Sequence, residues 1–289
     1  MNKNILVTGS KGFIGSALVR KLSQEFPGYT IFEFDLHNGN IAETKLDFYQ
    51  IDHVFHLAGK TFVPDSWKYP HEFYKTNVLG TSNILEFCKE KKSSITYISA
   101  YVYGEPELIP IPEQHPLKPN NPYMHSKVIA ESLCEFYASF YQVRTTIFRP
   151  FNIYGHNQNP KFLIPYIIGQ VINNDRDHIT VKNLEPKRDF LFLDDLIEAL
   201  ILSMKQNKIL NIYNVGSGTS DSVKEIIDIL QNIAQTNKKV RSENEVRKNE
   251  ILDLKADITK IERELGWKPK TIFRDGLKSI LESILKNEV

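Results

Sequence analysis

Cysteine is nearly absent from this sequence, with two residues among 289. Cys88 and Cys134 both lie inside amphipathic helical patterns, so we interpret them as buried thiols, and we expect neither a disulfide nor a bound metal. A chain of this length can bury a substantial core without disulfide bonds. These observations predict a reduced, cytoplasmic setting.

An excess of charge of one sign is also lacking. The formal net charge is +1, and no block of like charge extends beyond short lysine pairs. Nucleic acids and anionic membranes attract proteins through such blocks, so we expect neither as a partner.

Long apolar runs are missing as well, since none approaches the ~18 residues of a membrane-spanning helix. The chain starts with a run typical of a core strand, so we expect no signal peptide. A hydrophobic content of 41% and a charged content of 25% are those of an ordinary globular protein. The length suits one large α/β unit, or a large domain with a smaller lobe.

Strand and helix patterns alternate over the first half of the chain, which predicts an α/β fold with a Rossmann-type, doubly wound parallel sheet. β-prone runs lie at 5–8, 30–34, 53–57, 95–98 and 143–148, and the longest helical patterns lie at 70–91 and 123–141. The segment between the second and third of these runs is short, so a strand or its helix is expected to be truncated there.

After residue 150 the alternation loosens. Helical patterns at 165–174, 194–205, 222–235 and 275–286 are separated by short strands near 179–181, 189–193 and 212–215. We interpret residues 1–155 as one Rossmann-type domain and 156–289 as a smaller C-terminal lobe. Residues 188–206 are the part that could return to pack on the first domain.

The stretch from Ile5 to Gly15 is a short strand, a turn with three glycines and the start of a helix. In a dinucleotide site the first glycine permits the tight turn, the second lets the backbone approach a pyrophosphate and the third allows close helix–strand packing. The helix N-terminus then favours the anion. A purely structural turn is the alternative, and the flanking strand and helix favour the cofactor site. The residues assigned to it are Gly9, Lys11, Gly12, Phe13, Ile14 and Gly15.

Asp35 closes the second strand, about 20 residues beyond that turn, where a carboxylate accepts hydrogen bonds from the adenosine ribose of NAD. A helix cap is the alternative role. Lys11 could neutralise a ribose 2′-phosphate, or it could be a surface lysine. The sequence therefore favours NAD and leaves NADP open.

Tyr123 and Lys127 are four residues apart, which places them on one face of a helix. A neighbouring ammonium and a positively charged nicotinamide ring favour a phenolate, which would bring the tyrosine pKa toward neutral pH. Ser99 follows a buried strand at its carboxyl end, where open parallel sheets bind ligands. A surface Tyr–Lys pair is the alternative.

Taken together these segments resemble the extended short-chain dehydrogenase/reductases, in the group of nucleotide-sugar epimerases, dehydratases and reductases. The matching segments span nearly the whole chain in the order of the family: 8–15, 56–59, 77–81, 99–104, 123–127, 149–155, 188–190 and 265–269. The resemblance implies a Rossmann fold, with NAD or NADP bound by the domain of residues 1–155 and a nucleotide diphosphate-sugar substrate bound by the lobe of residues 156–289. It also implies a homodimer formed by the helices of 70–91 and 123–141.

The resemblance also implies roles for individual residues. Ser99, Tyr123 and Lys127 form the catalytic triad. The cofactor is bound by the glycine turn, Asp35, Asn40, Leu57, Ala58, Gly59, Asn77, Tyr123, Lys127 and Pro150. The substrate is bound by Ser99, Asn152, Phe162, Leu163, Arg188 and Arg247, of which the two arginines contact the phosphates.

The sequence departs from the family pattern at several positions. Dehydratases of the group place an Asp-Glu pair directly after the catalytic hydroxyl residue, where this chain has Ala100 and Tyr101. A 4,6-dehydratase activity is therefore not expected. Ile98 replaces a second hydroxyl residue, and Asn40 stands where an aspartate usually contacts adenine.

The function predicted from these observations is NAD(P)-dependent redox chemistry at C4 of a nucleotide diphosphate-hexose. Reduction of a 4-keto-6-deoxyhexose is favoured, and an NAD-dependent 4-epimerase is the alternative. A catalytically inactive, dinucleotide-binding sensor is a third reading, which the intact Tyr123–Lys127 pair disfavours. The nucleotide and the sugar are not determined by the sequence.

Overall fold

Six parallel strands form the central sheet of the computed structural model, which describes residues 3–244 and 251–287. The strand order is β10-β5-β4-β3-β1-β2, and every pair is parallel. The bounds are β1 (Asn4–Thr8), β2 (Thr30–Phe34), β3 (His53–His56), β4 (Ser94–Ile98), β5 (Thr145–Pro150) and β10 (Leu210–Val215). The order reverses at β1, whose neighbours are β2 and β3, and ligands of open α/β sheets bind at such a point. The predicted Rossmann-type fold is confirmed.

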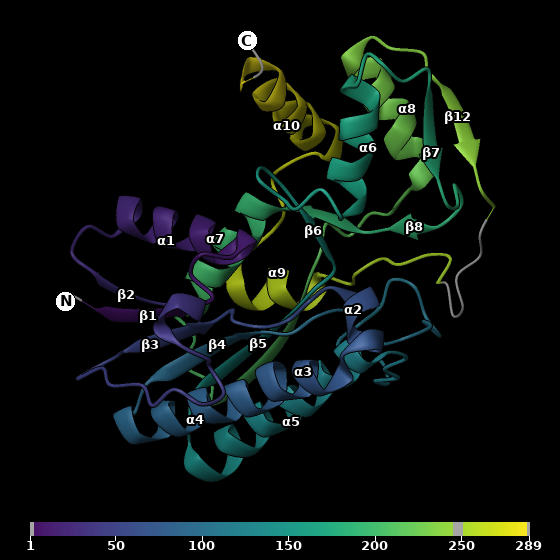
Figure 1. Ribbon diagram of the computed structural model, residues 1–289. Coiled ribbons are helices and arrows are strands. Elements are labelled where there is room, and N and C mark those ends of the chain that lie inside the picture. The colour runs from purple at the N-terminus through teal and green to yellow at the C-terminus, as the bar shows by residue number, and fades with distance from the viewer. Residues whose placement is uncertain (1–2, 245–250, 288–289) are drawn as a thin grey trace.

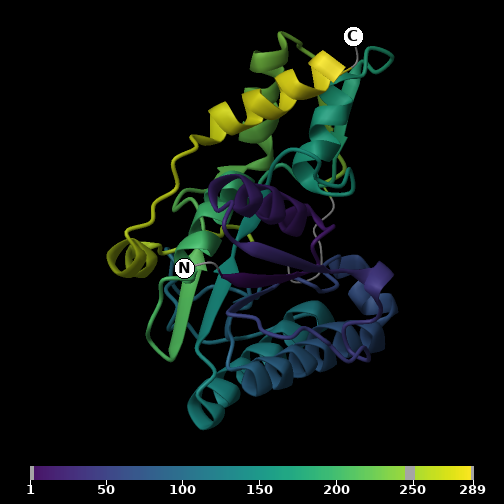
Figure 2. The ribbon, with the colours of Figure 1, turned by 90° about the vertical axis from the view of Figure 1, so that its left-hand side faces the viewer.

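Helices cover both faces of this sheet, as Figures 1 and 2 show. On one face lie α1 (Phe13–Glu25) and α7 (Leu193–Ser203), and on the other lie α4 (Gly80–Lys91) and α5 (Pro122–Tyr141). The apolar run of β1 explains this, because alternate residues of a strand point to opposite faces. Ile5 and Val7 pack in the core with α1 and α7, whereas Leu6 packs in the core with α4 and α5.

The segment from 60 to 91 is helical over most of its length. It contains α2 (Val63–Lys68), α3 (Pro70–Tyr74) and a single π-helical turn (Lys75–Leu79) that runs directly into α4. The helix predicted over 70–91 is confirmed in extent, and α2 precedes it. Pro64 lies in the first turn of α2, where proline is tolerated.

A second lobe packs on one side of the sheet, in the upper part of Figure 1, and the C-terminal helix belongs to it. Its core lies between α6 (Leu163–Ile172), α8 (Val223–Ala234) and α10 (Phe273–Asn287), with β7 (His178–Val181) paired to β12 (Lys239–Ser242). Two further pairs lie nearer the sheet: β6 (Asn152–Tyr154) with β9 (Phe190–Phe192), and β8 (Lys187–Arg188) with β11 (Asp221–Ser222). The sequence did not predict β12 or α9 (Thr259–Leu265).

The chain returns to the sheet after residue 155. Helix α7 packs in the same core as α1, and β10 pairs with β5 as the sixth strand of the sheet. The division at residue 155 stays a prediction, and β10 and α7 are the parts beyond it that contribute to the sheet and its helical layer.

The stretch between β2 and β3 is as short as the sequence suggested. All of it is described, and it holds one 3₁₀ turn (Leu36–Asn38) and no strand. The chain therefore passes from β2 to β3 without the extra edge strand of a complete Rossmann sheet. Among the described residues, no helix is both long enough and apolar enough to cross a membrane.

Candidate active site

The glycine turn joins β1 to α1 with its backbone packed against neighbouring backbone. Gly9 has a φ of +69°, and a Cβ there would lie 2.7 Å from the backbone nitrogen of Ala58. A Cβ on Gly15 would lie 2.0 Å from the carbonyl oxygen of Gly9, so this position also excludes every other residue. Gly12 is the N-cap residue of α1, and no side chain caps the helix there. The turn thus has the close approaches that a pyrophosphate-binding backbone requires.

Lys11 lies in this turn with its ammonium directed at β2. Its Nζ is 2.7 Å from Oε2 of Glu33, and the contact holds the pKa of the Glu33 carboxyl below its ordinary value. The side chain of Lys11 is 60% exposed. The charge of Lys11 is therefore partly neutralised by this chain's own carboxylate.

Asp35 follows β2 and faces the same turn. Its carboxylate accepts hydrogen bonds from the backbone N–H of Lys11 (2.8 Å) and of Leu36 (2.7 Å), and it caps the 3₁₀ turn. Asp35 therefore has the capping role that the sequence analysis named as the alternative to ribose binding. A carboxylate has about four acceptor positions, so two bonds leave room for ribose hydroxyls. Asn40 is used locally, since its side-chain oxygen accepts from the N–H of Ala42.

The end of β3 lies beside α4 and α5. A Cβ on Gly59 would be 3.1 Å from Oδ1 of Asn77 and 3.5 Å from Nζ of Lys127. Asn77 is buried in the π-helical turn, bonds both backbone groups of Lys60 and donates to Oγ of Ser126 (2.9 Å). Leu57 and Ala58 connect Gly59 to the strand, and the N–H of Ala58 donates to Oγ1 of Thr8. One cluster thus joins β3, α4 and α5.

Helix α5 carries the predicted Tyr–Lys pair and is fixed at its start by a cap. The side chain of Asn121 accepts from the N–H of Met124 (2.9 Å), and Pro122 occupies the first turn. Both features are strong helix-start signals. They set the position of Tyr123, one residue into the helix.

Lys127 points at the carboxyl end of β4, next to Ser99. Its Nζ donates to the carbonyl oxygen of Ile98 (2.7 Å) and lies 4.7 Å from the centre of the Tyr97 ring. The Ser99 Oγ is buried and has no hydrogen-bond partner among the described residues. A buried hydroxyl without a partner is costly unless a ligand supplies one. The structure thus brings Lys127 and Ser99 together, with Tyr123 one turn before Lys127.

Burial changes the pKa of both ionisable members of this group. It raises the pKa of the Tyr123 phenol well above its ordinary value, so the lowering expected from Lys127 is not present in the protein alone. It lowers the pKa of Lys127 from 10.5 to about 8, against the opposing effect of Glu131. An additional positive charge would favour the phenolate.

The lowered pKa of Lys127 predicts a pH-dependent stability. Between about pH 8 and pH 10.5 the unfolded chain binds a proton at Lys127 that the folded chain does not, so the free energy of unfolding rises with pH in that window. At 1.36 kcal/mol per pKa unit the rise is at most about 3 kcal/mol. Denaturant unfolding of the wild type and Lys127→Met near both ends of the window measures it. The difference between the two proteins should grow toward pH 10.5, and parallel curves would contradict the assignment.

Pro150 and Asn152 lie where β5 passes into β6. Pro150 is buried opposite Val215 of β10. Both the backbone N–H and the side-chain amide of Asn152 donate to the carbonyl oxygen of Asp189, at 3.0 and 3.1 Å. Asp189 is buried, and its carboxylate accepts from Ser217, Gly218 and Ala256, so Asn152 is held by a residue that is itself held by two segments.

The remaining predicted substrate residues belong to the second lobe. Phe162 precedes α6, is 38% exposed and lies edge-on to Phe62 of the first domain, while Leu163 begins α6 and packs in the core of the lobe. Arg188 donates to the carbonyl oxygens of Lys187 and Ile251. Arg247 lies outside the described residues.

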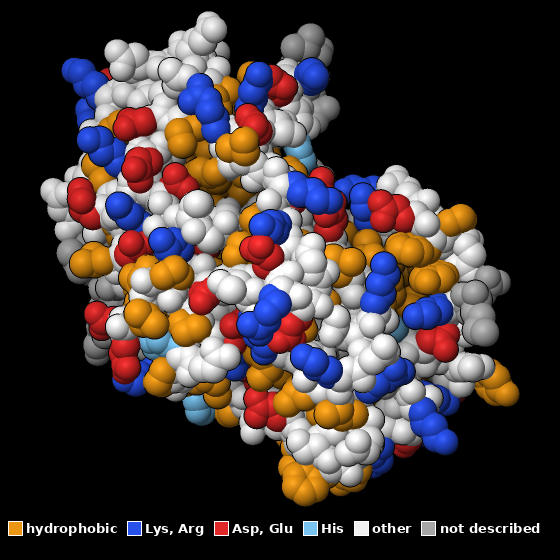
Figure 3. Space-filling model, turned by 180° about the vertical axis from the view of Figure 1, so that it is seen from behind, with side chains coloured by type: hydrophobic (Ala, Val, Ile, Leu, Met, Phe, Trp, Pro, Cys, Tyr) orange, Lys and Arg blue, Asp and Glu red, His pale blue; other side chains and the backbone are white. Residues whose placement is uncertain are grey.

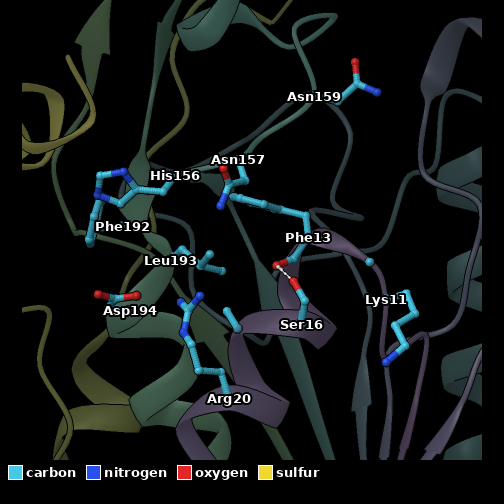
Figure 4. A pocket seen from close by; sticks show the side chains of 12 residues that line it. Lys11, Phe13, Ser16, Arg20, His156, Asn157, Asn159, Phe192, Leu193 and Asp194 are labelled. Atoms are coloured by element: carbon cyan, nitrogen blue, oxygen red, sulfur yellow. Dashed lines mark hydrogen bonds between the residues drawn. The ribbon is translucent and has the colours of Figure 1, made fainter. Parts of the chain in front are cut away.

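A polar cavity of about 400 Å³ opens beside the glycine turn, between α1, the start of α7 and the loop after β6 (Figure 4). It adjoins Lys11, Gly12 and Phe13 of the turn. Sequence reasoning missed the residues that complete it, which are Ser16, Ala17, Arg20, His156, Asn157, Asn159, Phe192, Leu193 and Asp194. The polar loop directly after the 149–155 segment was a signal for His156 and the two asparagines. Arg20 and Asp194 carry no sequence signal, because helix packing alone brings them together.

The family model described as GDP-mannose 4,6 dehydratase matches residues 24–280. A putative UDP-glucose 4-epimerase of Methanocaldococcus jannaschii is 31% identical, over 98% of this chain and 99% of that protein. The GDP-6-deoxy-D-mannose reductase of Pseudomonas aeruginosa is 30% identical over 97% of each. The human dTDP-D-glucose 4,6-dehydratase is 31% identical, over 99% of this chain and 91% of that protein.

Solved structures of similar proteins also match this chain in their three-dimensional fold. RMD from Pseudomonas aeruginosa complexed with NADPH superposes with a TM-score of 0.91 at 29% identity, covering 100% of this chain and 99% of that one. The UDP-glucose 4-epimerase of Thermotoga maritima with UDP-glucose has a TM-score of 0.90 at 27% identity, covering 99% and 100%. Reductases, epimerases and dehydratases are thus all similar to this chain.

Proposed function

The chain belongs to the extended short-chain dehydrogenase/reductases, in the group of nucleotide-sugar epimerases, dehydratases and reductases, and from this premise we propose that it reduces a nucleotide diphosphate-4-keto-6-deoxyhexose at C4. The observation that carries the proposal is the end of β4. There the buried hydroxyl of Ser99 has no hydrogen-bond partner in the described part of the chain, and the ammonium of Lys127 donates to the carbonyl oxygen of the preceding residue, Ile98. Neither of the two residues after Ser99 is a carboxylate, since they are Ala100 and Tyr101.

The residues of the first domain fit a dinucleotide. Gly9 and Gly15 leave no space for a side chain in the turn that a pyrophosphate would approach, and a Cβ on Gly12 would be tight. Asp35 retains acceptor capacity, and Gly59 lies against Lys127 and Asn77. We propose that Pro150, Leu57 and Ala58 complete this site. When bound, the nicotinamide supplies or accepts the hydride.

This chain's own residues handle the proton. Tyr123 donates its phenolic proton to the oxygen at C4 during reduction, and Ser99 donates a hydrogen bond to the same oxygen. Lys127 is anchored on the carbonyl of Ile98 and stabilises the phenolate that remains. Asn152, Arg188 and Arg247 are proposed for the diphosphate, and Phe162 with Leu163 for the base.

The alternative is an NAD-dependent 4-epimerase, which the similarity to the two UDP-glucose 4-epimerases favours. A 4,6-dehydratase needs an acid/base pair after Ser99. Ala100 has no ionisable group, and burial raises the pKa of Tyr101, so we propose that this chain does not dehydrate its substrate even though dehydratases are among its relatives.

A nicotinamide absorbance assay with a panel of nucleotide sugars tests the proposal. Each 4-keto-6-deoxyhexose is offered with NADH or NADPH, and each hexose is offered alone. A reductase consumes stoichiometric reduced cofactor with one ketosugar. Interconversion of two hexoses without net absorbance change would contradict it and establish the epimerase.

The contact between Lys11 and Glu33 predicts how cofactor choice can be changed. A 2′-phosphate must compete with the Glu33 carboxylate for Lys11 and is repelled by it. Glu33→Gln should therefore raise the ratio of kcat/KM for NADPH over NADH by about two- to fivefold, the range of an exposed ion pair. Glu25→Gln, which removes the partner of Lys21 on α1, is the matched control and should leave the ratio unchanged. An unchanged ratio in Glu33→Gln would mean that Lys11 does not contact the 2′-phosphate.

We propose a homodimer that pairs α4 and α5 with the same helices of a second copy. Phe136, Phe140 and Tyr141 at the end of α5 are 47%, 71% and 47% exposed. In Figure 3 hydrophobic side chains show at the lower edge of the molecule, where these helices lie, as they also do elsewhere on that face. Light scattering should give twice the chain mass, and a monomeric mass at working concentration would refute the dimer.

A further inference from the structure

A buried histidine ends β3, at the edge of the sheet where the glycine turn lies. His56 is 1% exposed, and both of its ring nitrogens have a partner. Nδ1 lies 2.8 Å from Oγ1 of Thr8, the residue directly before the turn, and Nε2 lies 3.1 Å from Oγ1 of Thr81 in α4. The imidazole thus connects β1, β3 and α4 at the carboxyl end of the sheet.

The partners of these hydroxyl groups determine which ring nitrogen carries the proton. Burial lowers the pKa of His56 to about 3, so the ring is neutral and has a single N–H. The hydroxyl of Thr81 donates its only proton to the carbonyl oxygen of Asn77 (2.6 Å), and it must therefore accept from Nε2. Nδ1 is left as the acceptor, and the hydroxyl of Thr8 donates to it. Every hydrogen bond in this chain, which ends at the carbonyl of Asn77, thus has a fixed direction.

The chain of hydrogen bonds ends in the π-helical turn. Such single turns are rare and are often found at functional sites. The side-chain amide of Asn77 bonds both backbone groups of Lys60 and donates to Oγ of Ser126. The Ser126 hydroxyl in turn donates to the carbonyl oxygen of Tyr123 (2.7 Å). The position of Asn77 therefore fixes both the backbone that follows Gly59 and the first turn of α5.

A second histidine of β3 has the same kind of partners at the other end of the strand. The nitrogens of His53 lie 2.8 Å from Oγ of Ser94 and 3.0 Å from Oγ1 of Thr96, and burial lowers its pKa to about 3 as well. The Thr96 hydroxyl lies 2.6 Å from Oγ of Ser203 at the end of α7. His53 thus joins the strand to a helix as His56 does, but on the opposite face and at the amino end, away from the edge that binds ligands.

We propose that His56 is a positioning residue for the dinucleotide, which holds Asn77 through Thr81 and so shapes the cofactor site between β3 and α5. The inference rests on the proposed function, because Asn77 and Gly59 are residues proposed for the cofactor. It deepens that proposal by assigning a role to a buried histidine that acts only through other side chains. His53, which has no such connection to the site, contributes to stability alone.

Fluorescence titration with NADH and NADPH, together with denaturant unfolding, tests the inference in two matched pairs of variants. His56→Phe and His53→Phe each remove a buried imidazole, and Thr81→Val and Thr96→Val each remove the hydroxyl that joins it to a helix. All four substitutions should lower the free energy of unfolding. Only His56→Phe and Thr81→Val should bind the cofactor more weakly, by about two- to tenfold, the range that one hydrogen bond contributes.

Two further variants distinguish the two ring nitrogens. The amide of glutamine can place a donor where Nε2 lies, whereas the shorter asparagine reaches only the position of Nδ1. His56→Gln should therefore recover most of the cofactor affinity that His56→Phe loses, and His56→Asn should not. A role in stability alone would give the two variants the same cofactor affinity.

Two results of the titrations would overturn the inference. Equal cofactor affinities in His56→Phe and His53→Phe would assign both histidines to stability. Full recovery in His56→Asn would assign the role to the contact with Thr8. A wild type that binds reduced cofactor but reduces no ketosugar would count against the proposed function, while the affinities would still decide the role of His56.

The inference remains testable if His56→Phe does not fold. Thr81→Val then carries the comparison with Thr96→Val, and nitrogen NMR of the imidazole groups in the wild type adds an independent measurement. We expect His56 to have its proton on Nε2 and not to titrate between about pH 5 and 8, since its pKa is lowered to about 3. A proton on Nδ1, or a titration within that range, would contradict the chain of hydrogen bonds on which the inference depends.

Discussion

Tyr123→Phe is expected to lower kcat by about 10²- to 10⁴-fold, the contribution typical of a positioned general acid. The phenol is the group proposed to give its proton to the C4 oxygen, and it lies one helical turn from Lys127, whose ammonium is fixed on the carbonyl of Ile98. The substitution keeps the ring and its edge-on contact with Phe73, so the fold should be unaffected. Steady-state kinetics and a titration with reduced cofactor are to be compared with the wild type.

Tyr141→Phe is the matched control, since it removes a phenolic hydroxyl from the far end of the same helix. Its kcat should equal that of the wild type. The assignment of Tyr123 fails if Tyr123→Phe keeps wild-type turnover of every accepted sugar. A loss of cofactor affinity that accounts for the whole effect would instead make Tyr123 a binding residue.

Gly15→Ala is expected to disrupt the cofactor site and to destabilise the protein. The added Cβ would lie 2.0 Å from the carbonyl oxygen of Gly9 and 2.9 Å from Cα of Ser10, so the backbone of the turn must move. Overpacking of this kind costs about 1–3 kcal/mol and sometimes more. Because the displaced backbone is the part proposed to contact the pyrophosphate, affinity for NADH and NADPH should fall by at least about tenfold, the equivalent of ~1.4 kcal/mol. Denaturant unfolding and a fluorescence titration measure the two effects.

Gly169→Ala is a control for the substitution itself. Gly169 lies inside α6, and its Cβ would meet no atom within 4 Å. Alanine is favoured over glycine in a helix by about 0.5–1 kcal/mol, so this variant should be slightly more stable and should bind cofactor normally. If Gly15→Ala is as stable as Gly169→Ala and binds the cofactor as tightly, the backbone of the glycine turn does not exclude a Cβ at residue 15.

The sheet and its helical layers were predictable because local pattern and tertiary position agree. The alternation of Ile5, Leu6 and Val7 between two cores, and the cap at Asn121 that starts α5, are readable one segment at a time. The truncation of a strand or its helix between β2 and β3 was predicted from the length of the segment alone. In each of these cases the interaction that decides the structure is close in sequence.

The parts that could not be predicted depend on contacts between distant segments. The pattern of 210–215 is that of any short strand, and only pairing with β5 makes it part of the central sheet. The exposed strand β12 has no apolar alternation, since its first three residues are exposed, and it is defined by its partner β7.

The candidate site likewise has features that the local sequence predicts and features that depend on distant segments. The glycine spacing and the Tyr123–Lys127 pair are local signals, and the structure brings Lys127 to Ser99. The contact of Lys11 with Glu33 and the hydrogen bonds that Asp189 accepts join segments about 20 to 70 residues apart, so no spacing rule indicates them. Burial raises the pKa of Tyr123 in the protein alone, so the lowering predicted from the sequence stays a prediction for the complex with a positively charged nicotinamide.

Transfer of deuterium from a labelled nicotinamide to the sugar tests the central claim most directly. The protein is incubated with NADH or NADPH deuterated at C4 of the nicotinamide and with each nucleotide diphosphate-4-keto-6-deoxyhexose, and the product is analysed by NMR. The account predicts one deuterium per product molecule, bound at C4 in a single configuration. Product that carries no deuterium at C4, or carries it at another carbon, would contradict the proposal that this chain reduces the sugar at C4.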